Sequence, residues 1–368
     1  MKDREILLYA FPFLLRKIKN PSYDLEIFRQ LHDKLELIPF LIDRSKTIKL
    51  PVNCYFDEKY NIPDYVDTND SFLESGINAV KIVEKENKNI YILWSGGIDS
   101  TYVLCSFLAS HIDKKTVTIV CNHNSIAEYP WFWHNIIKKH NLNYMSTEKF
   151  FQWGKWNLID GIIFEANPID GLFGGVLSNM LIQKGKIEYL YHDADDDTII
   201  YIFQEFGLSK NESQIMNEII KKTKVQSPRK IENIYDVFWW FGYNFLWCGT
   251  CIKGELRFHE KTDYRSFFNE IPMQQWAIKN VKPLTGLYSY KKDYLLSSIL
   301  EYTGDIEYYA HKRKYQSNVK FMLTATACMK TNYRMIYKHV ETNLLLFQEK
   351  DNIINNYITN YFKEIEND

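Results

Sequence analysis

Residues 91–101 read Tyr-Ile-Leu-Trp-Ser-Gly-Gly-Ile-Asp-Ser-Thr, and this stretch decides the fold. An apolar run ends abruptly at Ser-Gly-Gly, and an apolar stretch of helical length begins just beyond it. This order predicts a buried strand, a glycine turn and the N-terminus of a helix. Two adjacent glycines let backbone N–H groups approach an anion without interference from Cβ, and the helix dipole favours negative charge there. The stretch therefore predicts a phosphate-binding turn, to which the hydroxyls of Ser95, Ser100 and Thr101 would add donors.

The segments around this turn alternate between strand-like and helix-like patterns, as a parallel sheet requires. Strands are expected at residues 90–94, 116–121, 142–145, 159–164 and 187–191, and helices at 99–111, 128–140 and 176–183. In a doubly wound sheet, ligands bind beyond the carboxyl ends of the strands. Residues 95–100, 122–124 and 192–197 fall at such ends. We therefore expect an α/β fold with a doubly wound, mostly parallel sheet and one nucleotide site.

Composition sets the broad class of the protein. A hydrophobic content of 46% in 368 residues supplies a large core, which argues against disorder. A net charge of −1 gives no general attraction to nucleic acid, and no apolar run approaches the length of a membrane span. Six scattered cysteines favour a reducing cytoplasm. The pattern divides the chain into an accessory segment (1–85), a nucleotide-binding core (86–204) and a mainly helical C-terminal extension (205–368).

The string Ser-Gly-Gly-Ile-Asp-Ser at residues 95–100 resembles the signature of the PP-loop ATP pyrophosphatases. This superfamily includes asparagine synthetase and 7-cyano-7-deazaguanine synthase. The resemblance implies that the sheet binds ATP with Mg²⁺ and that ATP is split between its α- and β-phosphates. A carboxylate or carbonyl oxygen is adenylylated, and a nitrogen or sulfur nucleophile then displaces AMP. The chain has no Gly-x-x-x-x-Gly-Lys-Ser/Thr string, which argues against a Walker-type NTPase.

The resemblance also indicates which residues contact ATP. The expected set is Trp94, Ser95, Gly96, Gly97, Ile98, Asp99, Ser100, Thr101, Cys121 and Asn122. Within it, the strand end at Cys121 and Asn122 would receive the adenine and ribose, with Trp94 or a nearby apolar residue against the adenine face. Asp99 would ligate Mg²⁺ directly or through water, because Mg²⁺ keeps several waters and few protein ligands. Capping the following helix is the alternative role for Asp99.

Two further stretches are similar to parts of asparagine synthetases. Residues 170–175 read Asp-Gly-Leu-Phe-Gly-Gly, where that family has Asp-Glu-Leu-Phe-Gly-Gly with acidic residues that bind magnesium and pyrophosphate. Asp170 matches, but Gly171 replaces the glutamate. Lys291 or Lys292 opens a segment similar to the C-terminal part of the family and would stabilise the leaving pyrophosphate. Exposed lysines on a helix face are the alternative.

Two other clusters suggest metal chemistry. Cys248 and Cys251 resemble part of the cysteine cluster of 7-cyano-7-deazaguanine synthase, with Gly254 in place of its third cysteine. A zinc site and a degenerate site that no longer binds zinc both remain open, because tetrahedral zinc needs two more ligands. The acidic loop 192–197 would either hold Mg²⁺ or an amine substrate, or cap the next helix.

The leading functional hypothesis is an AMP- and pyrophosphate-forming ligase that adenylylates a carboxylate or amide carbonyl of a small molecule for attack by a nitrogen nucleophile. The glutaminase cysteine of amidotransferase-type asparagine synthetases is missing, because Lys2 occupies position 2. Ammonia or an amine would therefore come from solution or from a partner protein. The alternatives are an enzyme acting on a deazapurine carboxylate, a tRNA-modifying enzyme, which the charge balance does not favour, and a non-catalytic ATP- or AMP-binding module.

Overall fold

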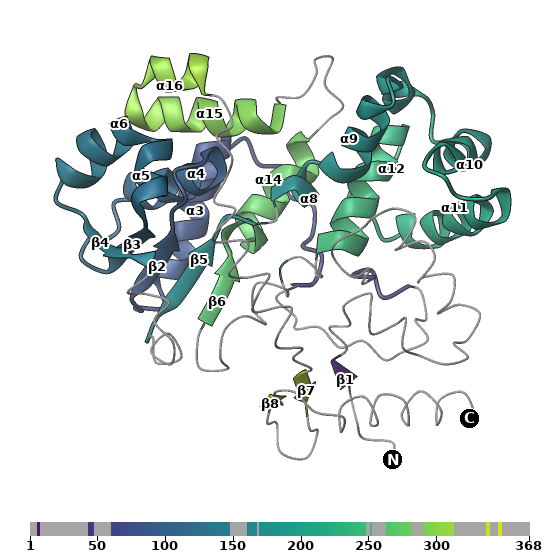
Figure 1. The fold of residues 1–368 in the computed structure, drawn as a ribbon. Coiled ribbons are helices and arrows are strands. Elements are labelled where there is room, and N and C mark those ends of the chain that lie inside the picture. The colour runs from purple at the N-terminus through teal and green to yellow at the C-terminus, as the bar shows by residue number, and fades with distance from the viewer. Residues whose placement is uncertain are drawn as a thin grey trace. The chain divides into compact units, whose positions relative to one another are not determined.

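The computed structural model describes residues 6–7, 43–47, 60–147, 160–167, 169–247, 251, 263–281, 290–312, 336–338 and 345–347 (Figure 1). The chain forms two compact units, and each is assembled from separate segments. The sheet unit consists of residues 63–173 and 254–325, and the helical unit of residues 1–62, 174–253 and 326–368.

A five-stranded parallel sheet forms the centre of the sheet unit. Its strands, in chain order, are β2 (Ile90–Leu93), β3 (Val117–Cys121), β4 (Asn143–Ser146), β5 (Ile162–Glu165) and β6 (Asp263–Ser266). Every neighbouring pair runs parallel, and in the central pairs Ile90 lies opposite Val117 on one side and Ile162 on the other. One face of the sheet carries a buried cluster of Val120, Ile163 and Tyr264.

The spatial order of the strands is β4-β3-β2-β5-β6. The chain builds outward from β2 to β4 on one side, then crosses to the other side of β2 for β5 and β6. This order confirms an α/β architecture compatible with a doubly wound sheet, in which ligands bind where the order reverses. The reversal lies beside β2, the strand that leads into the glycine turn.

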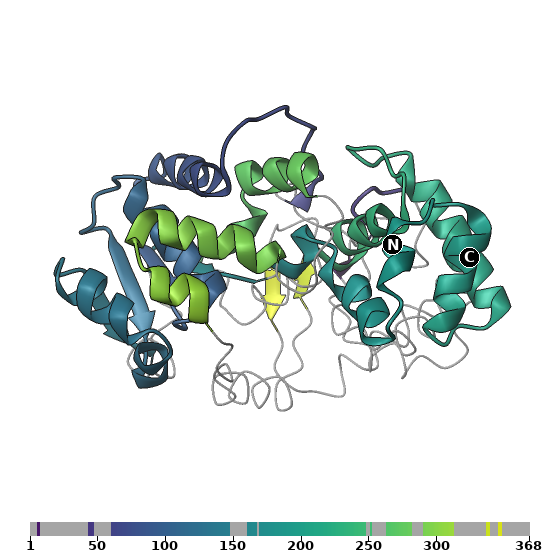
Figure 2. The ribbon, with the colours of Figure 1, turned by 90° about the horizontal axis from the view of Figure 1, so that it is seen from above.

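Helices pack around this sheet and connect its strands. They are α3 (Phe72–Glu84), α4 (Ile98–Ala109), α5 (His123–Glu128), α6 (Pro130–Phe132), the π-helical turn η2 (Trp133–Lys138), α8 (Ile169–Leu172), the 3₁₀ turn η6 (Phe267–Asn269), α14 (Ile271–Asn280), α15 (Tyr290–Thr303) and α16 (Ile306–His311). Helix α4 packs on β2, α3 and α15, and α14 packs on α3. Figures 1 and 2 show α16 beside α15.

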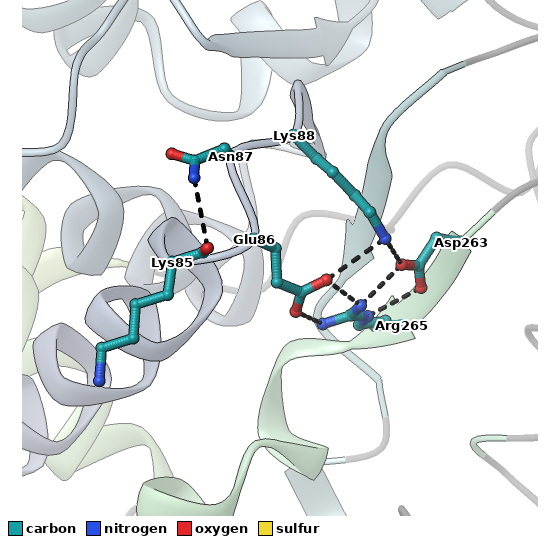
Figure 3. A network of polar contacts seen from close by, with 6 residues as sticks. All are labelled: Lys85, Glu86, Asn87, Lys88, Asp263 and Arg265. Atoms are coloured by element: carbon teal, nitrogen blue, oxygen red, sulfur yellow. Dashed lines mark hydrogen bonds and ion pairs between the residues drawn. The ribbon is translucent and has the colours of Figure 1, made fainter.

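A charged network ties the amino end of β6 to the turn before β2 (Figure 3). The Arg265 guanidinium donates to Glu86 Oε1 and Oε2 at 2.6 and 2.8 Å, and to Asp263 Oδ1 at 2.8 Å. Lys88 Nζ lies 3.0 Å from Asp263 Oδ2 and 3.3 Å from Glu86 Oε2. Because every cation contacts both carboxylates, the network fastens the edge strand β6 at the end of the sheet opposite the glycine turn.

The helical unit contains most of the remaining elements. They are α9 (Gly175–Gln183), the 3₁₀ turn η4 (Ile187–Tyr191), α10 (Asp196–Glu205), α11 (Lys210–Lys224), α12 (Ile234–Phe241), the π-helical turn η5 (Gly242–Leu246), and three short strands, β1 (Ile6–Leu7), β7 (Ile336–Lys338) and β8 (Leu345–Phe347). The three strands pair antiparallel in the order β1-β7-β8. The aromatic stretch of α12 and η5 is fully buried in the core of this unit.

One predicted strand is wrong. Residues 187–191 form the 3₁₀ turn η4, and the loop 192–197 therefore follows a helical turn and not a sheet strand. The compact units also run across the boundaries predicted at residues 85 and 204, because α3, β6, α14 and α15 belong with the sheet. In the part of the chain that the structure describes, no helix combines the length and apolarity needed to cross a membrane.

Candidate nucleotide-binding site

The predicted strand, turn and helix are all present at the start of the sheet. β2 ends at Leu93, the turn occupies residues 94–97, and α4 begins at Ile98 with Gly97 as its N-cap residue. The turn thus lies at the carboxyl end of β2, beside the reversal of strand order. Backbone N–H groups of the first helical turn have no partner within the helix, so they form the usual anion-binding end of a helix.

The two glycines of the turn have different environments. Gly96 has a φ of +77°, and a Cβ placed on it would lie 2.2 Å from the backbone oxygen of Ser125 and 2.7 Å from Glu128 Cβ. Gly96 is therefore required for the turn to pack against α5. Gly97 has an ordinary φ of −74°, and its Cβ would meet only Ser95 Oγ within 4 Å, at 3.2 Å. The fold itself does not require glycine at position 97, so the open space beside it is the feature suited to a ligand.

Helix α4 also lacks a side-chain N-cap, because Gly97 has no side chain. Some other helices have a side-chain cap, whereas α9 and α14, like α4, have none. Asn122 caps α5 in a reciprocal capping box with Ser125, and Asp195 caps α10 by accepting from the backbone N–H of Thr198. A cap accepts the N–H groups that an anion would otherwise contact. The N-cap residue of α4 offers no such acceptor, although the Gly97 backbone N–H itself donates to Ser95 Oγ at 3.3 Å.

The three predicted hydroxyl donors do not have equal roles. Ser95 is exposed, and its Oγ lies 2.9 Å from Ser100 Oγ, so these two hydroxyls line the turn together. Thr101 is fully buried, and its Oγ1 accepts a hydrogen bond from the Trp94 indole Nε1 at 3.0 Å. Trp94 is only 2% exposed and packs against Phe132. The predicted contacts of Thr101 with phosphate and of Trp94 with the adenine face therefore do not fit the structure; both residues support the turn from the core.

The remaining predicted residues of the nucleotide site lie at the expected strand and helix ends. Ile98 and Asp99 are half-buried in the first turn of α4, where a carboxylate also favours the helix dipole. Cys121 is buried at the end of β3. The Asn122 side chain accepts from the backbone N–H of Ser125 at 3.0 Å, so it serves as a helix cap. Backbone groups at this strand end, and not these two side chains, are therefore the better candidates for contacts with a base.

Helix α16 and its N-cap residue Asp305 pack against Tyr129, the residue after α5. The rings of Tyr129 and Tyr308 stack with centroids 3.6 Å apart. Asp305 accepts from the Tyr129 hydroxyl at 2.9 Å and from the backbone N–H of Tyr308 at 3.0 Å, which caps α16. Burial raises the pKa of Tyr308, and the negative charges of Glu128 and Asp99 add to the rise. Asp99, Glu128 and α16 therefore share one electrostatic environment.

Lys312, the residue after α16, forms a buried ion pair at the same place. Its Nζ donates to Glu128 Oε1 at 2.6 Å and to the Glu128 backbone oxygen at 3.3 Å. The two side chains are only 6% and 12% exposed. The Glu128 side chain also borders Gly96, so this pair brings a cation next to the glycine turn. In the sequence, Lys312 is one of several consecutive basic residues, and no local pattern distinguishes it.

Glu165 is a second residue of interest that the sequence analysis did not identify. Glu165 is 7% exposed and ends β5, the strand that pairs with β2 across the reversal of strand order. Asn167 Nδ2 lies 3.5 Å from its Oε2. Glu165 is thus a buried carboxylate at the carboxyl end of a central strand, the edge of the sheet where ligands bind in such folds. Its position directly after three apolar strand residues was the available signal.

The other predicted residues divide into three groups. Asp170 lies in α8, and Lys291 and Lys292 lie in the first turn of α15, but their side chains are outside the described residues, as is Cys248. Cys251 is buried in the helical unit. The acidic loop belongs to that unit too, where Asp195 caps α10 and Asp196 pairs with Lys221. Among the described residues, no three His, Cys, Asp or Glu side chains are grouped to hold a metal ion.

Comparisons with known proteins do not identify a relative. No protein-family model, no curated protein and no solved structure matches the chain. The function is therefore argued from the residues of the site.

Proposed function

We propose that this chain is an ATP-dependent ligase of the PP-loop type, which forms AMP and pyrophosphate. In this reaction a carboxylate oxygen of the substrate attacks the α-phosphorus of ATP, and the bond to the bridging oxygen breaks to release pyrophosphate. A nitrogen nucleophile then attacks the adenylylated carbonyl carbon, and AMP leaves. The products are an amide-type bond, AMP and pyrophosphate.

The observation that carries this proposal is the turn after β2. Gly97 opens onto space that its own Cβ would enter, and the N-terminus of α4 has no side-chain cap. The hydroxyls of Ser95 and Ser100 lie beside it. These groups suit a phosphate chain, because they offer hydroxyl and backbone donors beside a helix dipole, and a phosphate could take the place of Ser95 Oγ as the acceptor of the Gly97 N–H.

The charges around the turn also fit an ATP·Mg²⁺ complex. Asp99 and Glu128 contribute two carboxylates, and Lys312 contributes one ammonium group. Bound Mg²⁺ would neutralise part of the phosphate charge beside these carboxylates. Asp99 is the residue we expect to hold the ion, directly or through water. The site then acts by positioning the reactants and stabilising charge, with no protein nucleophile.

The test is the identity of the nucleotide products. The full chain is incubated with Mg²⁺, α-labelled ATP, pools of carboxylic acids including 7-carboxy-7-deazaguanine, and ammonia. Asp99→Asn is the variant and Asp197→Asn is its matched control, since both carboxylates lie in the first turn of a helix. We expect AMP and pyrophosphate that depend on a carboxylate, and their loss in Asp99→Asn only.

Two outcomes would contradict the proposal. ADP and phosphate would show cleavage between the β- and γ-phosphates. Binding of ATP without turnover in every pool would favour a non-catalytic nucleotide-binding module.

A further inference from the structure

We infer that the Glu128–Lys312 ion pair is a resting contact, which a phosphate chain bound at the glycine turn replaces. Lys312 would leave the Glu128 carboxylate and pair with the phosphates, so Glu128 competes with the nucleotide for one cation. The inference rests on the proposed nucleotide site and adds a control on how tightly that site binds.

The first support is the position of the pair. Glu128 is the last residue of α5, and its Cβ and Cγ would lie 2.7 and 3.1 Å from a Cβ at Gly96. Lys312 Nζ is 2.6 Å from Oε1 of that same side chain. The Glu128 side chain therefore borders the turn at Gly96 with its Cβ, and its carboxylate holds the ammonium group that a bound phosphate chain would attract.

The second support is charge balance. In the resting pair, the Lys312 ammonium is neutralised by Glu128, while the Asp99 carboxylate stands in the first turn of α4. An ammonium group has three donors and no fixed geometry, so it can exchange one oxygen partner for another. A phosphate chain presents more charge and more acceptor oxygens than one carboxylate. Exchange is therefore favoured when the turn is occupied, and pairing with Glu128 is favoured when it is empty.

The third support is that α16 has an anchor separate from this pair. Asp305 bonds to Tyr129 at 2.9 Å, and the Tyr129 ring stacks on Tyr308. Lys312 also contacts the Tyr308 ring, with Nζ 5.3 Å from the centroid. These contacts hold the helix when the Lys312 side chain changes partner. The exchange then needs a rotation of side-chain torsions and no movement of the fold.

The test measures binding of α,β-methylene-ATP with Mg²⁺ to the full chain by titration calorimetry. The variants are Glu128→Gln, Lys312→Gln and the double variant, with Glu232→Gln and Lys230→Gln as controls from an exposed ion pair in the helical unit. We expect binding about tenfold tighter in Glu128→Gln and about tenfold weaker in Lys312→Gln, the size of a typical coupling between sites. The double variant should resemble Lys312→Gln, and the controls should bind as the wild type does.

The opposite signs separate the inference from a structural role. A pair that only supports the fold would weaken binding in both variants or change it in neither, and either result would overturn the exchange. If the wild type itself binds no nucleotide, the proposed function fails and the exchange fails with it. If Glu128→Gln does not fold, as judged by circular dichroism, Glu128→Asp decides instead, and binding no tighter than the wild type refutes the exchange.

Discussion

The two glycines of the turn allow a sharp comparison, because one is required by the fold and the other by the proposed ligand. The perturbation is a single added methyl group, made as Gly96→Ala in one variant and as Gly97→Ala in another. We expect Gly96→Ala to lower the free energy of unfolding strongly. We expect Gly97→Ala to leave stability nearly unchanged and to weaken nucleotide binding.

The magnitude at Gly96 follows from its backbone and its neighbours. Alanine at a φ of +77° costs about 1–2 kcal/mol, because Cβ then crowds the backbone. The new Cβ would also lie 2.2 Å from the Ser125 backbone oxygen, and this atom cannot move unless α5 moves. Overpacking of this kind costs about 1–3 kcal/mol. The expected loss in the free energy of unfolding is therefore about 2–5 kcal/mol.

At Gly97, the two contributions of an alanine to the free energy of unfolding nearly cancel. Alanine can adopt the φ of −74° and ψ of 163° of this residue without strain. Gly97→Ala should therefore raise the free energy of unfolding by about 0.4–1 kcal/mol, because alanine lowers the conformational entropy of the unfolded chain. Alanine is a poorer N-cap residue than glycine, and this difference lowers the free energy of unfolding by a similar amount. The net change in the free energy of unfolding should stay within about 1 kcal/mol. The methyl group nevertheless occupies the space that a phosphate would enter, so we expect at least a tenfold loss in affinity.

Two measurements on the same preparations test this reasoning. Urea denaturation followed by tryptophan fluorescence gives the free energy of unfolding, and calorimetric titration with α,β-methylene-ATP and Mg²⁺ gives the affinity. Equal destabilisation by both substitutions would refute the structural distinction between the glycines. A Gly97→Ala variant with wild-type stability and wild-type affinity would refute the assignment of the open space to a phosphate.

Three further expectations test individual contacts. Thr101→Val should lower the free energy of unfolding by about 1–3 kcal/mol, because the buried Trp94 indole loses its acceptor, and should leave nucleotide affinity unchanged in calorimetry. Burial alone would raise the pKa of Asp263, but hydrogen bonds from Arg265 and Lys88 lower it overall; its contribution to stability should be present at neutral pH and lost as pH falls through the lowered value. Asp263→Asn should therefore lose less stability than the wild type between about pH 5 and pH 2 in urea titrations. Asp305→Asn should weaken the contact with Tyr129 and speed amide hydrogen exchange in α16 while the amides of β2 keep their protection.

The sequence predicted the local order of the site well, because the order depends on neighbouring residues. Ile90–Leu93 is apolar and is followed by two glycines and a helical pattern, and the structure places a strand, a turn and α4 there. The strand at residues 187–191 was wrong for a reason that is also local. Residues 189–191 form a short run of aromatic and aliphatic side chains, but only Leu190 is buried, and the segment turns as a 3₁₀ helix between α9 and α10. A short apolar run alone does not show that a segment has a sheet neighbour.

The division of roles between similar residues was not predictable from the string. Ser100 and Thr101 are adjacent hydroxyl residues, yet Ser100 lines the turn and Thr101 accepts a hydrogen bond from the Trp94 indole. Both side chains are buried, and their neighbours decide the difference: the Ser95 hydroxyl lies beside Ser100, and the Trp94 indole lies beside Thr101. Gly96 and Gly97 are likewise identical in sequence, and only the approach of α5 distinguishes them.

No local sequence pattern could predict that Lys312 lies beside Glu128, because the two residues are far apart in the sequence. Glu128 and Lys312 are 184 residues apart, and the intervening chain includes residues 174–253, one of the three segments of the helical unit. Only the return of the chain to the sheet, through β6, α14, α15 and α16, brings the lysine to the turn. The segment 86–204 predicted as the nucleotide-binding core would contain the glycine turn but neither its neighbouring cation nor the edge strand β6. The proposed nucleotide site therefore combines residues from both sides of this insertion, and the cation that we expect to face a phosphate comes from the later one.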